Sequence, residues 1–382
     1  MITLVKDTID NNDIDQLVDW LKTYPRLTKG PLTLELEEKW SKWLGRKYSV
    51  FCNSGSSANL LMLSAVGQDI GYKDCKVVVP SVAWATDLAP VIQLGMKPIL
   101  CDSNMEDLSI DLEHLEKIFE EEDPSVLMLV SVLGLVPDMD KIVDLCMQYN
   151  VILLEDTCES MGCEYKGKKL GTFGDMSSFS TYFGHHISTI EGGFVSTDDF
   201  ELYELLLSLR SHGWDRDLSK DTQQKLQKEW NISEFDAMYT FYHPGYNLRS
   251  TDLQAYIGLS QIDKLDSWGK KREQNFKLYQ DLIQNDYWKV NPQKDSFISS
   301  FAYPVIHPNR DKIVKELQDN DIEVRPMICG SMGTQPFYVN KYGRLELHNV
   351  SVIDKHGFYI PNHPGLVNDD IQFISDIINK EI

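Results

Sequence analysis

The chain has 382 residues, 42% of them hydrophobic, and a formal net charge of -21. This charge argues against sequence-independent nucleic-acid binding and against an anionic membrane surface, so neither nucleic acid nor membrane is an expected partner. The length exceeds one ordinary domain and favours a large domain with a smaller companion.

The amino-terminal stretch lacks the basic start and apolar core of a signal peptide, and no apolar run is long enough to span a bilayer. We therefore expect a cytoplasmic protein. The seven cysteines are scattered and form no CxxC pair, unlike a disulfide framework or a structural zinc site, and no metal is expected. Most of them should be buried as small hydrophobes.

Apolar residues at helical spacing predict helices within residues 10–47, with Gly45 as a stop. A short strand at 48–52 is followed by the turn NSGSSAN at 53–59, which leads into an apolar helix. This order exposes free backbone N–H groups at the positive end of a helix, where a phosphate can bind. Taken alone, the turn favours a simple N-cap, because a serine-rich turn is more often a cap than an anion site.

From residue 76 onward, short apolar runs alternate with helix-length segments, which predicts a mostly parallel sheet covered on both faces. The run VILLEDTCES at 151–160 is typical of a central strand ending in acids. Ligands bind at the carboxyl ends of such strands. We therefore expect several separate stretches to converge on one edge of the sheet: residues 53–57, Trp84, Asp156, Glu159 and the loop that carries His185.

The second half of the chain begins with an amphipathic helix that runs into His212. Residues 215–242 are polar and predict a long, irregular surface excursion, and loops of that length are often functional. A long helical stretch follows, and from residue 296 a smaller α+β pattern appears. The expected fold class is α/β, with a large N-terminal domain over 1–264 and a small C-terminal α+β domain over 265–382.

An aspartate at the end of a buried strand, an aromatic ring from another loop and a cradle of small residues together suit a pyridine ring that carries a phosphate. Pyridoxal phosphate (PLP) fits this description. A buried carboxylate at Asp156 would keep the pyridine nitrogen protonated, Trp84 would stack on the ring, and Ser56 and Ser57 would hold the phosphate. Taken singly, Asp156 as an N-cap and Trp84 as a core residue are the commoner roles; their combination favours the cofactor.

The sequence resembles the DegT/DnrJ/EryC1/StrS aminotransferase family of fold type I PLP enzymes over almost its whole length. The resemblance rests on NSGSSAN, VAWAT, LLEDTCESMG, SFSTYFGHHISTIEGG, GYNLR and IEVRP. Ordinary members carry a lysine six residues before the glutamate of the EGG turn, where it bonds covalently to the cofactor. His185 stands at that place here, and no lysine occurs between Lys169 and Lys220.

The resemblance is strongest to the histidine-bearing branch of the family, which removes the C3 hydroxyl of a nucleotide-linked 4-keto-6-deoxysugar. An imidazole has no primary amine, so the cofactor must bind noncovalently, while the ring still moves protons near pH 7. The implied activity is a PLP-dependent lyase of deoxysugar and O-antigen lipopolysaccharide biosynthesis, with GDP-4-keto-6-deoxymannose as the expected substrate. Glutamate would convert PLP to pyridoxamine phosphate (PMP), and the products would be a 3,6-dideoxy-4-keto sugar, 2-oxoglutarate and ammonia.

The resemblance also implies roles for individual residues. His185 is the expected acid and base, with Glu159 near the cofactor ring and His212 as a second candidate. His186 has the weaker claim, because adjacent side chains on an extended loop point opposite ways. The cofactor-binding residues would be Gly55, Ser56, Ser57, Trp84, Asp156, Glu159, Ser180 and Asn247.

In the family the asparagine equivalent to Asn247 reaches the phosphate of the neighbouring subunit, which implies a homodimer with shared active sites. Arg249 and Arg325 are candidates for binding carboxylate or diphosphate groups of the substrate, with solvated surface arginine as the alternative. An iron–sulfur cluster, which another histidine-bearing relative requires, is not expected, because downstream of Cys163 the chain has only Cys329.

Two alternatives to the dehydratase stay open at this point. The first is a nucleotide-sugar aminotransferase that recruits a lysine from elsewhere in the chain. The second is a noncatalytic nucleotide-sugar-binding homologue that keeps the fold and the ligand site.

Overall fold

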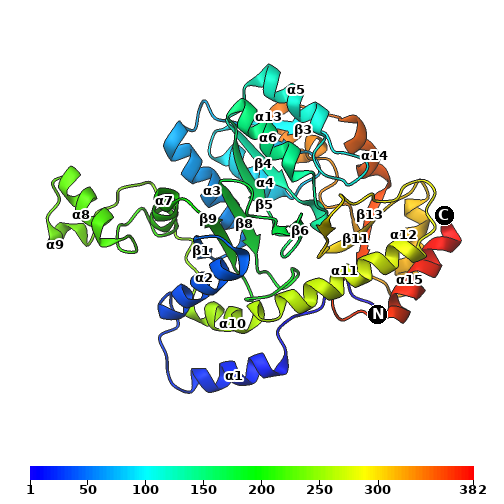
Figure 1. The fold of residues 1–382 in the computed structure, drawn as a ribbon, viewed down its shortest axis with the longest axis horizontal. Coiled ribbons are helices and arrows are strands. Elements are labelled where there is room, and N and C mark those ends of the chain that lie inside the picture. Colours follow the sequence, from blue (N-terminus) through cyan, green and yellow to red (C-terminus); the bar gives the residue numbers. More distant parts are fainter.

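The computed structural model describes residues 1–382. A seven-stranded sheet lies at its centre, in the order β1-β9-β8-β5-β4-β2-β3 (Figure 1). Only β9 is antiparallel to its neighbours; every other adjacent pair is parallel. The strands are β1 (Tyr48–Cys52), β2 (Lys76–Pro80), β3 (Lys97–Cys101), β4 (Val126–Val130), β5 (Ile152–Asp156), β8 (Met176–Ser180) and β9 (Gly193–Thr197).

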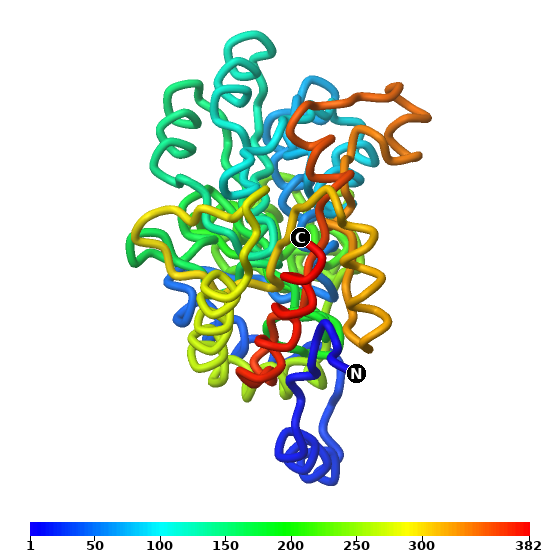
Figure 2. Tube along the Cα trace, turned by 90° about the vertical axis from the view of Figure 1, so that its right-hand side faces the viewer, coloured from blue at the N-terminus to red at the C-terminus, as the bar shows by residue number.

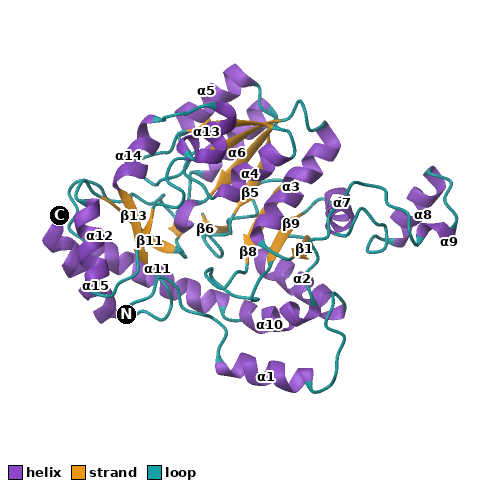
Figure 3. Cartoon of the chain, turned by 180° about the vertical axis from the view of Figure 1, so that it is seen from behind, coloured by secondary structure: helices purple, strands orange, loops and turns teal.

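Helices flank this sheet on both sides, as the view from behind shows (Figure 3). Strands β4, β8 and β9 are buried along their whole length, as expected of a sheet covered on both faces, although of the three only β4 is a continuous apolar run. The predicted α/β class with a mostly parallel mixed sheet is confirmed. The helices up to residue 210 are α1 (Asn11–Leu21), α2 (Pro31–Leu44), α3 (Gly55–Ile70), α4 (Ala85–Gln93), α5 (Leu112–Glu122), α6 (Met139–Tyr149) and α7 (Phe200–Arg210).

Two smaller sheets complete the fold. One is antiparallel, in the order β11-β13-β12, with β11 (Ala302–Ile306), β12 (Arg325–Pro326) and β13 (Gly357–Pro361). The other contains β10 (Ser296–Phe297), β6 (Glu164–Tyr165) and β7 (Lys168–Lys169), so a late segment pairs with the first half of the chain. The proposed division after residue 264 falls directly before helix α11.

The remaining helices include α10 (Asp252–Ile262) and the long helix α11 (Leu265–Leu282), which run beneath the sheet in Figure 1. The C-terminal helix α15 (Asn368–Glu381) lies beside α11, whereas α1 stands away from the body (Figure 2). The others are α12 (Arg310–Asp319), α13 (Pro336–Tyr342) and α14 (His348–His356). No helix combines the length and the apolarity needed to cross a membrane.

Arg272 of α11 joins this helix to the segment before β11. Its side chain is buried, and Nη1 lies within hydrogen-bond distance of the carbonyl oxygens of Ser300 (3.3 Å), Phe301 (3.1 Å) and Asn362 (2.5 Å), which share its two hydrogen atoms. No carboxylate lies within ion-pair distance of the guanidinium, so three backbone dipoles hold this buried cation.

The prediction of an irregular excursion over 215–242 is wrong in one respect. The segment projects from the body, as Figure 1 shows, but it contains α8 (Lys220–Glu229) and α9 (Glu234–Ala237). Helix α8 has no buried residue, so it lacks the apolar stripe by which a helix is recognised in a sequence. Ser219 caps it by accepting a hydrogen bond from the Thr222 N–H.

Candidate active site

A cavity of about 380 Å³ opens at the carboxyl edge of the central sheet. Its walls come from the turns that follow β1, β2, β5 and β8, where strands of one direction deliver their side chains to a common edge. The structure brings together in this cavity seven of the residues singled out in the sequence: Gly55, Ser56, Trp84, Asp156, Glu159, Ser180 and His185.

One end of the cavity is formed by the start of α3. The N-cap is Ser54, whose Oγ accepts a hydrogen bond from the Ser57 N–H at 3.1 Å. Ser57 is thereby engaged in the cap and does not line the cavity, while the N–H groups of Gly55 and Ser56 have no acceptor within the chain. These two donors at the positive end of a sixteen-residue helix, beside the Ser180 hydroxyl, suit a phosphate group.

A substitution at Gly55 tests this cradle. A Cβ atom there would lie 2.6 Å from Ser180 Cβ and 3.0 Å from Cys158 Sγ, so Gly55→Ala must push α3 away from the strand ends. We expect the free energy of unfolding to fall by about 1–3 kcal/mol and PLP affinity to fall with it, measured by urea unfolding and by fluorescence titration. Gly269→Ala, on α11 with nothing closer than 3.4 Å to its Cβ, is the control: it should leave PLP affinity unchanged and, because alanine favours a helix interior, should raise the free energy of unfolding by at most about 1 kcal/mol. Unchanged PLP affinity in Gly55→Ala would contradict the cradle.

Asp156, the last residue of β5, also lines the cavity. Its side chain is buried; Oδ1 accepts from the Cys158 N–H at 2.8 Å and Oδ2 accepts from Asn59 Nδ2 at 2.6 Å. Asn59 in turn accepts from the Ser178 hydroxyl at 2.6 Å, which fixes its orientation. Asp156 is therefore held as a carboxylate facing the cavity, as a partner of a pyridinium nitrogen must be.

Trp84 is the N-cap residue of α4, and its side chain is 54% exposed although it lines the cavity. The role of a core residue is thus excluded. An indole ring with a free face at the cavity wall can pack on a planar ligand.

The two adjacent histidines point to different places. His185 lines the cavity, packs its ring 5.4 Å from the Phe301 ring, and has a buried Nδ1 without a hydrogen-bond partner. His186 lies outside the cavity and places Nε2 2.6 Å from the Ser299 carbonyl oxygen. Burial lowers the pKa of His185 to about 4, although the Asp156 carboxylate opposes this shift. The imidazole is therefore neutral near pH 7 and free to accept a proton.

Glu159 is a second proton carrier in the cavity wall. Its Oε2 accepts a hydrogen bond from the Leu133 N–H at 2.7 Å. Burial raises the pKa of this carboxyl group to about 7, and the nearby Asp156 carboxylate adds to the effect. Glu159 therefore exchanges its proton in the neutral range, where an enzyme needs an acid or base.

The raised pKa of Glu159 has a consequence for stability. Above the ordinary glutamate pKa the unfolded chain loses this proton while the folded chain keeps it, so stability falls as pH rises from about 4.5 to 7. The loss amounts to about 3 kcal/mol. We expect Glu159→Gln to flatten this part of the pH profile of the melting temperature. An identical slope in both proteins would show that Glu159 ionises normally.

Three predicted residues form a separate cluster next to the turn that starts α3. Arg249 Nε donates to Asn247 Oδ1 at 3.1 Å, and its Nη2 lies 3.4 Å from His212 Nε2. The Asn53 N–H donates to the Leu248 carbonyl, which joins this segment to the turn before α3. None of the three lines the cavity within one chain, and Asn247 is exposed.

Arg325 lies apart from the other predicted residues. It is exposed on β12, with Nη2 3.8 Å from Glu323 Oε1, and it lines a different depression of about 230 Å³. Its register partner on β13 is Tyr359, which does line the cavity.

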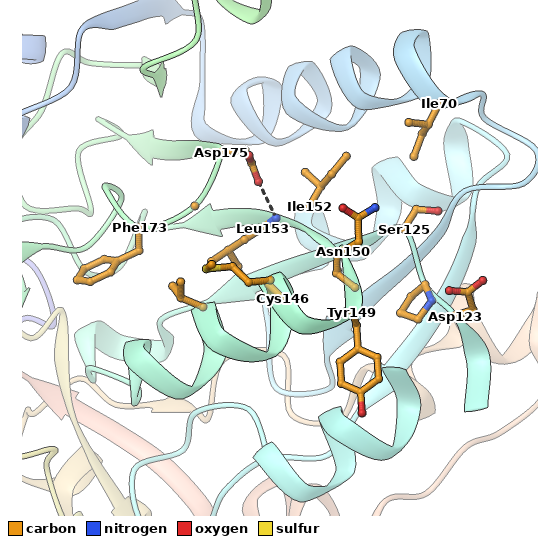
Figure 4. Close-up of a pocket in the computed structure, with 15 residues that line it drawn as sticks. Ile70, Asp123, Ser125, Cys146, Tyr149, Asn150, Ile152, Leu153, Phe173 and Asp175 are labelled. Carbon is orange, nitrogen blue, oxygen red and sulfur yellow. Dashed lines mark hydrogen bonds between the residues drawn. The ribbon is translucent and has the colours of Figure 1, made fainter. Parts of the chain in front are cut away.

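A larger cavity of about 850 Å³ lies at the opposite, amino-terminal edge of the sheet (Figure 4). Its lining is mostly apolar, and of its two carboxylates, Asp123 and Asp175, the second already accepts the Leu153 N–H at 3.0 Å. It contains no histidine, lysine or arginine. The side chains for acid–base chemistry lie in the smaller cavity.

An α/β fold whose cavity combines a buried carboxylate, free helix N–H groups and an aromatic ring suits a PLP-dependent enzyme. The chain belongs to the DegT/DnrJ/EryC1/StrS aminotransferase family, whose model matches residues 7–379. Its cofactor is pyridoxal phosphate.

Individual relatives agree with this assignment. GDP-4-keto-6-deoxy-D-mannose 3-dehydratase of Yersinia pseudotuberculosis is 33% identical, over 98% of this chain and 96% of the relative. GDP-perosamine synthase of Caulobacter vibrioides is 28% identical, over 97% and 95%. The solved structure of E. coli GDP-4-keto-6-deoxy-D-mannose-3-dehydratase with bound hydrated PLP matches with a TM-score of 0.88 at 29% identity, over 99% of both chains.

Proposed function

We propose that the protein is a PLP/PMP-dependent 3-dehydratase of a nucleotide-linked 4-keto-6-deoxysugar, GDP-4-keto-6-deoxymannose, with glutamate as amino donor. The observation that carries the proposal is that His185 lines the cavity and no lysine does. A lysine there would supply a primary amine for covalent attachment of the cofactor, and an imidazole does not. The names of the relatives described above support the same substrate.

The cofactor, when bound, supplies an amino group that joins the sugar ketone and a ring that withdraws electrons from the adjacent bonds. The chain supplies the rest. Asp156 holds the proton on the ring nitrogen, Trp84 packs on the ring face, and Gly55, Ser56 and Ser180 hold the phosphate. His185, neutral at pH 7, takes a proton from the C4′ carbon and delivers it to the hydroxyl that leaves sugar C3. Glu159 is the remaining proton donor in the wall.

The experiment supplies GDP-4-keto-6-deoxymannose, glutamate and PLP and determines the product by mass. Loss of the C3 oxygen, with release of 2-oxoglutarate and ammonia, is the expected result. Gain of an amino group at C4 would instead identify an aminotransferase, the second candidate, which the perosamine synthase relatives favour. Absence of 2-oxoglutarate would identify a binding protein.

We infer in addition that the protein works as a homodimer. The projecting segment 215–242, the arm, exposes large aromatic side chains: Trp230 (62%), Phe235 (76%), Tyr239 (74%) and Phe241 (53%). Such a group on a monomer surface indicates a contact with another chain. Asn247 follows the arm and is exposed, as a residue that serves a neighbouring site must be.

Sedimentation equilibrium tests this inference. Phe235→Glu should convert the dimer to a monomer and weaken PLP binding, because each site would lose its partner's contribution. Phe373→Glu, on the exposed face of α15, is the matched control. A wild-type protein that sediments as a monomer at micromolar concentration would refute the dimer.

A further inference from the structure

A second buried carboxyl group lies behind Asp156, and nothing in the proposed chemistry so far uses it. Asp87 of α4 is fully buried and lines the cavity. Its Oδ1 accepts from Asn59 Nδ2 at 3.1 Å, and its Oδ2 accepts from the Trp84 N–H at 2.9 Å. Asp87 therefore links the backbone of Trp84 to Asn59, which in turn donates to Asp156, so one carboxyl group connects the two residues that would hold the ring of the cofactor.

The Asn59 amide has fewer hydrogen atoms than there are acceptor oxygens around it, two of which belong to the carboxyl groups of Asp87 and Asp156. Asn59 Nδ2 lies 2.6 Å from Asp156 Oδ2, 3.1 Å from Asp87 Oδ1 and 3.3 Å from the Thr86 carbonyl oxygen. An amide nitrogen has two hydrogen atoms and cannot satisfy three acceptors. A proton on one of the two carboxyl groups supplies the missing donor.

The surroundings indicate which carboxyl group carries that proton. Asp156 accepts a short bond from Asn59 and another from the Cys158 N–H, both of which favour its ionised form. The titratable groups around Asp87 are Asp156 and Glu159, together with the thiols of Cys158 and Cys329, and none is a cation. Burial, with Asp156 as like charge, raises the pKa of Asp87 well above its ordinary value.

We propose that Asp87 is a positioning residue: it keeps the single proton of the carboxyl pair, so that Asp156 stays ionised, and it fixes Trp84 and Asp156 in one geometry. This inference rests on the proposed placement of the cofactor ring between those two side chains. It does not depend on which sugar the enzyme converts.

The test uses the full-length protein and two variants. Asp87→Asn keeps an acceptor for the Trp84 N–H and a permanent donor toward Asp156, but cannot ionise. Asp87→Ala removes both bonds. Asp370→Ala is the matched control, because Asp370 accepts the Val367 N–H at 3.0 Å in the same way at the start of α15, far from the cavity.

The first measurement is the melting temperature of the cofactor-free protein between pH 5 and 8. A neutral buried acid loses stability as pH rises, because the unfolded chain gives up the proton first. The wild-type melting temperature should therefore fall more steeply than that of Asp87→Asn, while Glu159 contributes equally to both. Parallel profiles would overturn the proposal.

The second measurement is PLP affinity, by quenching of tryptophan fluorescence at pH 7. Asp87→Asn should bind within about threefold of wild type, whereas Asp87→Ala should bind about tenfold more weakly or worse. Wild-type affinity in Asp87→Ala, or an equal loss in Asp370→Ala, would leave Asp87 with only a helix-capping role and refute the proposal. If Asp87→Ala does not fold, Asp87→Asn still decides through the pH profile. If both measurements give the expected results but the protein does not dehydrate the sugar, the proposed function is refuted and the role of Asp87 is not.

Discussion

His185→Gln should retain PLP but lose dehydration by about 10²–10⁴-fold, the contribution expected of one acid–base group. Glutamine keeps the polar volume beside Phe301 and cannot transfer a proton. The same variant should be equally slow in the first half of the reaction, measured as 2-oxoglutarate released from glutamate in a single turnover. His348→Gln, on the exposed start of α14, is the control and should match wild type.

The complementary variant His185→Lys returns a primary amine to the position. PLP should then become covalently attached, and reduction with borohydride should leave a cofactor-bearing peptide that contains residue 185. The wild-type protein should yield no such peptide. A reducible adduct on a lysine of the wild-type chain would support the aminotransferase instead. A dehydration rate of His185→Gln within threefold of the wild-type rate would show that His185 takes no part in the reaction.

Asp156→Asn should have the second-largest effect. The substitution removes the buried charge at nearly constant volume, so the ring nitrogen loses the partner that keeps it protonated, and we expect the rate to fall by about 10²–10³-fold. PLP affinity and rate are measured together, because a rate loss at saturating PLP isolates the electronic effect from binding. Asp102→Asn, which alters a buried carboxylate at the end of β3 that accepts the Val350 N–H, should leave the rate at saturating PLP unchanged. A wild-type rate in Asp156→Asn would rule out this role.

The central sheet could be predicted in part from the sequence, because strands β2, β4 and β5 are short apolar runs that end in distinctive turns, whereas β8 (MSSFS) is rich in serine and was not predicted. The same logic placed Asp156, Trp84 and His185 near one another, since side chains that follow parallel strands meet at one edge. Strand β13 and helices α13 and α14 were not predicted. They lie in the segment 332–361, where short elements depend on packing against one another and not on a periodic pattern.

The residues that sequence reasoning missed are those whose role depends on which face of a helix meets the sheet. Asn59 in α3 and Asp87 in α4 lie in helices that also carry serine, threonine or glutamine, so neither residue stood out in the sequence. The association of His212 with Asn247 and Arg249 depends on the bridge between Ser211 and Asn247, which joins segments far apart in the chain. No local pattern encodes such a contact.

The guanidinium of Arg272 sets how the cavity can open. If the segment that carries Phe301 moved away from α11, the buried Arg272 guanidinium would lose its carbonyl hydrogen bonds. That loss would cost several kcal/mol of free energy. The floor beneath His185 is therefore rigid in the absence of any ligand. Movement is left to the rim, where Trp84 and Tyr182 are 54% and 43% exposed. We therefore expect a bulky nucleotide sugar to enter by displacing the exposed side chains at the cavity entrance. The two walls of the cavity should not close on the ligand as rigid bodies.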